Sequence, residues 1–269
     1  MDLAMKRGAG CHHGGGAEPR PSTGLLGAGA ALFAISAAVT IGWGASMAAM
    51  PGMPMPGGWT MSMAWMRMPE QTWLGAATSF LGMWSVMMVA MMVPSLMPML
   101  WRHRLALGDA SGRRVAAQSL LVGAGYFLVW AAQGALIFPL GVAVAAAAMR
   151  WPLLARAVPL GVGAVVLGAG VLQVTPWKAR HLACCRGQHP AGRAADASAF
   201  QHGLRLGLHC GACCAGLTAV LLVLGVMDLA VMAAVTVAVT AERFAGARVA
   251  RAIGAGIVAA GLFLLVRAM

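Results

Sequence analysis

Residues 118–148 read QSLLVGAGYFLVWAAQGALIFPLGVAVAAAA and contain no charged side chain. An apolar stretch of about 20 residues is long enough to cross the hydrocarbon core of a bilayer as an α-helix. A helix also pairs its backbone N–H and C=O groups within the segment, as a lipid environment requires. The stretch therefore predicts a transmembrane helix.

The rest of the chain extends this pattern. Of its 269 residues, 60% are hydrophobic and 10% are charged, whereas a soluble domain has about 25% charged residues. The apolar runs are long, unlike the short alternating strands of a transmembrane barrel. Further runs cover residues 25–49, 73–100, 159–177, 205–226, 229–242 and 250–267. We expect an all-α polytopic transmembrane helical bundle of about seven helices, or six if the short run 229–242 does not cross.

Two parts are expected, a polar tail over residues 1–24 and a transmembrane helical domain over residues 25–269. The first apolar run is long enough to be an anchor that is not cleaved. With the tail in the cytoplasm, all lysines and arginines fall on the inner side except Arg67, Arg150, Arg156 and Arg267. This bias follows the positive-inside rule and predicts the inner membrane of a bacterium as the location, with a cytoplasmic N-terminus. It also explains the net charge of +12 without a nucleic-acid partner.

A cysteine cluster begins the run that follows residue 205, in the stretch HCGACC. On a helix, Cys210 and Cys214 share a face, as do His209 and Cys213, because residues four apart are neighbours. His181, Cys184 and Cys185 precede this cluster in a predicted cytoplasmic loop. Cys and His ligands from two converging elements are typical of soft-metal sites. Packing remains an alternative, since free cysteine behaves as a small hydrophobe.

Methionines form a second pattern in MWSVMMVAMMVPSLMPML, residues 83–100. Met87 and Met91 are four residues apart, and Met88 and Met92 form the adjacent column. Thioethers suit Cu(I), although methionine also fills irregular helix interfaces. Pro94 and Pro98 each remove a backbone donor and are expected to disturb this helix. The predicted outer loop, residues 50–68, is also rich in methionine and either collects Cu(I) or lies against lipid headgroups.

Four stretches in fixed order are similar to the family of predicted metal-binding integral membrane proteins, called domain of unknown function 2182. They are MWSVMMVAMMVPSLMPM, LQVTPWKARHLACCR, HGLRLGLHCGACCAG and GVMDLAVM followed by AER. The resemblance covers about residues 75–245 and implies a metal-binding membrane protein. Positions that match the family are Pro176, Lys178, Cys185, Arg186, Cys213, Cys214 and Glu242. Three positions depart from it, with His181 in place of a cysteine, Ala215 in place of a tryptophan and Arg243 in place of a lysine.

The sequence has no Gly-rich phosphate loop, no Ser/His/Asp set and only seven acidic residues, so no enzyme activity is predicted. We expect binding of a soft metal, Cu(I) in the first place and Zn(II) as the alternative, and its transfer across or along the bilayer. The partners implied are lipid and a metallochaperone or a metalloprotein under assembly. Two other functions stay open, a thiol–disulfide carrier that uses Cys210 and Cys213 as a C-x-x-C pair, and a structural protein whose cysteines pack.

Overall fold

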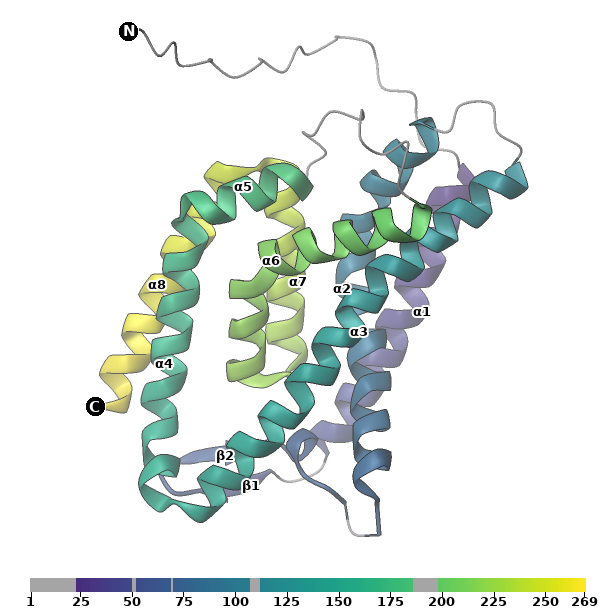
Figure 1. Ribbon diagram of the computed structural model, residues 1–269. Helices are drawn as coiled ribbons and strands as arrows, with labels where there is room; N and C mark the ends of the chain where they lie inside the picture. The colour runs from purple at the N-terminus through teal and green to yellow at the C-terminus, as the bar shows by residue number, and fades with distance from the viewer. Residues whose placement is uncertain (1–22, 50–51, 69, 107–111, 186–197) are drawn as a thin grey trace, which may run out of the picture.

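The computed structural model in Figure 1 describes residues 23–49, 52–68, 70–106, 112–185 and 198–269. The predicted polar tail therefore lies almost entirely outside the described residues. The helices are α1 (Thr23–Ala48), α2 (Trp73–Ala106), α3 (Gly112–Arg150), α4 (Pro152–Val174), α5 (Pro176–Cys185), α6 (Ala199–Gly225), α7 (Leu229–Ala245) and α8 (Ala247–Ala268). A short antiparallel hairpin of β1 (Met53–Met55) and β2 (Trp59–Met61) and a 3-10 turn, η1 (Met63–Trp65), join α1 to α2. The prediction of an all-α fold is confirmed.

Six helices, α1, α2, α3, α4, α6 and α8, are long and apolar enough to cross a membrane. Residues 229–242 do form a helix, but α7 has only 17 residues. Asp228 caps it by accepting hydrogen bonds from the backbone N–H groups of Ala230 and Val231, at 2.8 and 3.0 Å. In Figure 1 the turn between α6 and α7 ends short of the β1–β2 end of the molecule, and α7 returns to the α5 end. Helices α6 and α7 therefore begin and end on the same side of the membrane, whether they cross it fully or form a re-entrant pair. The arginines that follow residue 242 stay on the predicted inner side in both cases.

Two connections that the sequence predicts as loops contain regular structure. Residues 176–185 form α5, which closes the end of the bundle over α4 and α6 (Figure 1). The expectation of a loop for this segment was wrong because a ten-residue helix that contains Lys178 and Arg180 shows no apolar period in the sequence. The helix begins at Pro176, a residue tolerated in a first turn. At the opposite end, the methionine-rich connection folds as the β1–β2 hairpin, with Gly57 and Gly58 at positive φ in its turn.

Helix α2 is continuous through both of its prolines, so the expected disturbance does not break it. It packs along α1 and α3, while α4 packs along α8 and α6 along α3. The main core of buried side chains is formed chiefly by α2, α3, α6 and α7. It contains the methionines of α2 and the cysteines of α6, so the two sequence patterns meet in one place.

Close packing of α3 against α6 depends on glycine. Gly203 and Gly207 of α6 face the backbone of α3, and a Cβ atom at Gly207 would lie 2.9 Å from the carbonyl oxygen of Tyr126. Small residues spaced by four let two helix backbones approach within a membrane. This approach holds Tyr126 opposite the first cysteine of α6.

Replacing Gly207 by Leu should therefore destabilise the protein by about 1–3 kcal/mol, the usual cost of overpacking a well-packed interior. Thermal unfolding in detergent would measure the change. Gly123→Leu is the matched control, because a Cβ atom at Gly123 meets nothing within 4 Å. Equal melting temperatures for the two variants would contradict the close α3–α6 contact.

Candidate metal centre

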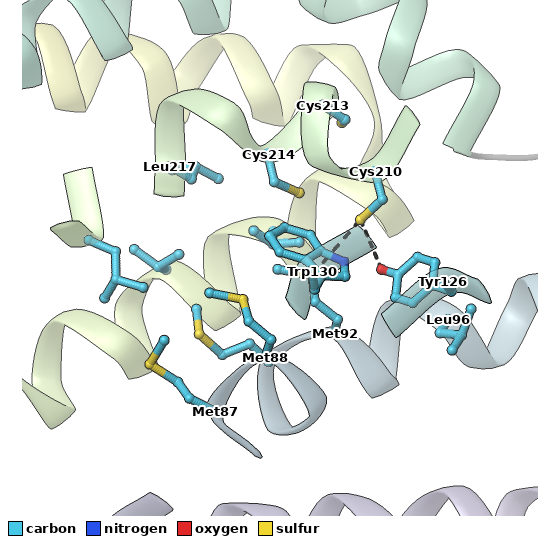
Figure 2. Packing of buried hydrophobic residues seen from close by; sticks show 14 of the residues in the cluster. Met87, Met88, Met92, Leu96, Tyr126, Trp130, Cys210, Cys213, Cys214 and Leu217 are labelled. Atoms are coloured by element: carbon cyan, nitrogen blue, oxygen red, sulfur yellow. Dashed lines mark hydrogen bonds between the residues drawn. The ribbon is translucent and has the colours of Figure 1, made fainter. Parts of the chain in front are cut away.

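Helix α6 turns its cysteines into the core. The side chains of Cys210, Cys213 and Cys214 are buried, and Figure 2 shows them above the methionines of α2. The spacing of four that places Cys210 and Cys214 on one face is seen in the structure. His209 is exposed instead, so it does not share the buried face of Cys213 as the sequence pattern suggested.

The thiol of Cys210 contacts polar and sulfur-containing side chains from three other helices. Its Sγ lies 2.9 Å from the hydroxyl of Tyr126 and 2.7 Å from Nη2 of Arg243, which donates to it. The Sδ of Met92 lies 4.0 Å from the same sulfur. The phenol, the guanidinium and the thioether come from α3, α7 and α2, so Cys210 stands where three other helices converge.

The methionines of α2 continue from this point as a buried column. Met83, Met87, Met88, Met91 and Met92 are all buried, and Figure 2 shows Met88 and Met92 next to the Trp130 indole and below Cys214. The indole N–H of Trp130 is buried and has no hydrogen-bond partner within the described part of the chain. The structure thus joins the predicted methionine helix to the predicted cysteine cluster through Met92.

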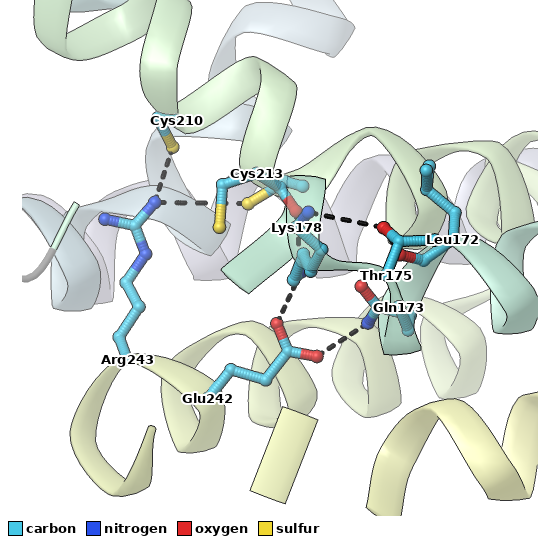
Figure 3. Close-up of polar contacts among 9 residues, drawn as sticks. Leu172, Gln173, Thr175, Lys178, Cys210, Cys213, Glu242 and Arg243 are labelled. Atoms are coloured by element: carbon cyan, nitrogen blue, oxygen red, sulfur yellow. Dashed lines mark hydrogen bonds and ion pairs between the residues drawn. The ribbon is translucent and has the colours of Figure 1, made fainter. Parts of the chain in front are cut away.

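Arg243 is a buried charge with an incomplete set of partners. It is 8% exposed, and its Nη2 points toward Cys210 (Figure 3). The same nitrogen lies 4.0 Å from Cys214 Sγ. Its Nε and Nη1 have no hydrogen-bond partner, and no carboxylate forms a salt bridge with it among the residues described. A charge at this depth is costly unless an anion compensates it, so the cysteine sulfurs are its available counter-charges.

A second buried network holds α4, α5, α6 and α7 together. Lys178 Nζ forms a salt bridge of 2.7 Å with Glu242 and donates a 2.6 Å hydrogen bond to the Cys213 carbonyl. Gln173 Nε2 donates to the other oxygen of Glu242 at 2.6 Å (Figure 3). Lys178 is therefore buried and paired, although it lies in the first turn of a short helix. It positions α5 against the cysteine turn of α6.

The remaining predicted ligands lie beside this centre. Cys185 of α5 is buried, and α5 packs against α6, which carries the other cysteines. Cys184 belongs to the same helix, but its side chain is outside the described part of the structure. His181 and His209 form a separate pair with ring centroids 5.7 Å apart. Burial lowers the pKa of His181, and His209 and Arg180 lower it further, which favours the neutral ring that can bind metal.

The predicted cysteine, histidine and methionine ligands are spread along the helices and do not surround a single metal position. Within the residues that the structure describes, no three His, Cys, Asp or Glu side chains are grouped to hold one ion. Cys210 and Met92 instead bring two soft donors together from different helices. Sequence reasoning missed Tyr126 and gave Arg243 no role. The signals available were that Tyr126 is the only tyrosine of the chain and that Arg243 adjoins an acidic residue in an apolar run.

Comparison with known proteins gives one family. A search of curated proteins and a search of solved structures both find no match. The family model described as PpoB2, copper chaperone, matches residues 81–264, a region that includes the methionine column, the cysteines, Lys178 and Arg243. A match over this much of the chain supports the copper relation that the sulfur donors suggest. The chain belongs to the PpoB2 copper chaperone family.

Proposed function

We propose that the protein is an integral membrane copper chaperone that binds Cu(I) as cargo at Cys210 and Cys214 and exchanges it with another protein. The observation that carries the proposal is the 2.7 Å contact between the buried Arg243 guanidinium and Cys210 Sγ. The thiolate, and not the thiol, is the form of cysteine that binds metal. A buried guanidinium beside two cysteine sulfurs favours that form.

The sulfur geometry fits a bound ion. A thiolate–metal bond is about 2.3 Å long in zinc sites, so two sulfurs on one ion are separated by at most about 4.6 Å. Cys210 Sγ and Met92 Sδ are 4.0 Å apart, within that limit. Thiolate and thioether together are a donor set that suits Cu(I). The ion would therefore need little movement of α2 or α6.

Charge balance favours a monovalent ion. Two thiolates, Cu(I) and the Arg243 guanidinium together have no net charge, and the Lys178–Glu242 pair adds none. With Zn(II) in the same place, one positive charge would remain. An uncompensated charge at membrane depth is disfavoured, so Cu(I) is the metal that this site accommodates best, ahead of the Zn(II) alternative.

The predicted topology gives the site a direction of access. It puts α5, Cys185 and the His181–His209 pair on the cytoplasmic side, where a soluble metallochaperone or an unfinished metalloprotein could dock. The methionine column leads from the centre toward the opposite end of α2. The donors support movement of copper either way, because each step exchanges one soft ligand for another without a change in oxidation state.

Titration of the reduced, detergent-purified protein with Cu(I) tests the proposal. The wild type should bind Cu(I) at Cys210 and Cys214, and the Cys210→Ser/Cys214→Ser variant should lose that ion because a hydroxyl is a poor ligand for soft metals. Cys11→Ser is the matched control and should retain it. Equal copper content in a folded double variant would overturn the proposal. Formation of a Cys210–Cys213 disulfide without copper binding would favour the thiol–disulfide carrier instead.

A further inference from the structure

A cavity of about 180 Å³ lies at the β1–β2 end of α1 and α2. Its lining includes five methionines and a tryptophan, namely Met47, Met63, Met66, Met68, Met83 and Trp43. They come from α1, from the connection between α1 and α2, and from the first half of α2. Helical spacing alone would not predict that three segments contribute thioethers to one cavity.

The chemistry of this lining is selective. Among the residues that the structure describes, no Asp, Glu, Lys, Arg, His or Cys lines the cavity, so it offers hard cations no carboxylate and Zn(II) no thiolate or imidazole. Gln71 and Ser79 add a neutral amide and a hydroxyl to the lining. The five thioethers are its soft ligands and suit a monovalent soft ion such as Cu(I). The Trp43 ring adds a π-face, which attracts cations. Methionine that served packing alone would be expected to fill this space, since protein interiors are close-packed.

Helix α2 connects the cavity to the metal centre through its buried methionines. Met83 lines the cavity and begins the buried column that ends at Met92, beside Cys210. At 1.5 Å per residue, Met83 and Met92 are about 14 Å apart along the helix axis. Thioethers at Met87, Met88 and Met91 divide that distance into short steps.

We propose that the cavity lined by Met47, Met63, Met66, Met68 and Met83 is a second Cu(I) site, at which copper enters or leaves the methionine column. Binding at this cavity stands on its own lining, whereas its role in transfer rests on the proposed function. Copper stays Cu(I) throughout, and each step breaks one sulfur–copper bond as another forms.

Methionine oxidation by hydrogen peroxide, followed residue by residue with mass spectrometry, tests the site. The full chain in lipid nanodiscs is treated in chloride-free buffer with and without Ag(I), a redox-inert substitute for Cu(I). At a free Ag(I) concentration about ten times the Kd, sulfoxide formation at Met63, Met66 and Met68 should slow about tenfold, because only the empty site is open to the oxidant. The exposed Met149 and Met269 are internal controls and should oxidise at unchanged rates.

A triple variant tests whether the methionines bind one Ag(I) ion together or each bind Ag(I) separately. In Met63→Leu/Met66→Leu/Met68→Leu, Ag(I) should no longer protect Met47, whereas Met149→Leu should leave that protection intact. Absence of Ag(I) protection at the cavity methionines of the wild type would overturn the proposal, as would equal protection of Met149. Protection that persists in the Cys210→Ser/Cys214→Ser variant would support the cavity even if the cysteine centre failed its own test.

Discussion

Replacing Glu242 by Gln should destabilise the protein by about 3–5 kcal/mol, the usual cost of removing one partner from a buried ion pair. The reason is that Lys178, 1% exposed, would keep its charge without the carboxylate that lies 2.7 Å away. Denaturation of the purified protein in mixed micelles would measure the loss. Glu70→Gln makes the same chemical change at an exposed residue and should leave stability unchanged.

The double variant Lys178→Met/Glu242→Gln makes this prediction specific. Removing both charges leaves no uncompensated ion, so the double variant should lose less stability than the two single variants added together. The amide that replaces the carboxylate would still be able to hydrogen-bond Gln173. Additive losses would mean that the two residues act independently, and the salt bridge would then have no part in holding α5 against α6.

Replacing Arg243 by Met should weaken Cu(I) binding strongly. Two thiolates and Cu(I) carry one negative charge, and the variant would bury it without a counter-charge. Removing one partner of a buried charge pair costs about 2–5 kcal/mol, which corresponds to roughly a 30- to 5,000-fold increase in Kd. Competition with a chromophoric Cu(I) chelator would measure the Kd. Arg267→Met, a change to an exposed arginine at the end of α8, is the control and should have no effect.

Two further measurements separate charge from folding. Arg243→Lys keeps the positive charge and should retain more of the Cu(I) affinity than Arg243→Met, although it loses the planar guanidinium. The preference for Cu(I) over Zn(II) should also narrow in Arg243→Met, because Zn(II) with two thiolates is neutral once the arginine is gone. An unchanged Kd and an unchanged metal preference in a folded Arg243→Met protein would remove Arg243 from the site.

Local sequence patterns were enough to establish the class of fold and to predict sulfur atoms as metal donors. Charge-free runs such as residues 118–148 leave helices as the means of burying the backbone in lipid, and the structure confirms long apolar helices over these runs. The spacing of Cys210 and Cys214 placed them on one helix face, because this relation is local and depends only on helical geometry. Helix α5 was missed because its ten residues are too short and too polar to show an apolar period.

How the donors meet depends on the packing of helices that are distant in the chain. Met92 and Cys210 are 118 positions apart, and Arg243 and Cys210 are 33 apart. Hydrophobic periodicity predicts the helix face on which a residue lies. It does not predict which other helix packs on that face, or at which position along the helix axis the two residues meet. Those axial positions are determined by the contact of α6 with α3 at Gly203 and Gly207, and by the return of α7 beside α6. For this reason the helix faces of the cysteines and methionines were predictable from the sequence, whereas the buried guanidinium beside Cys210 was not.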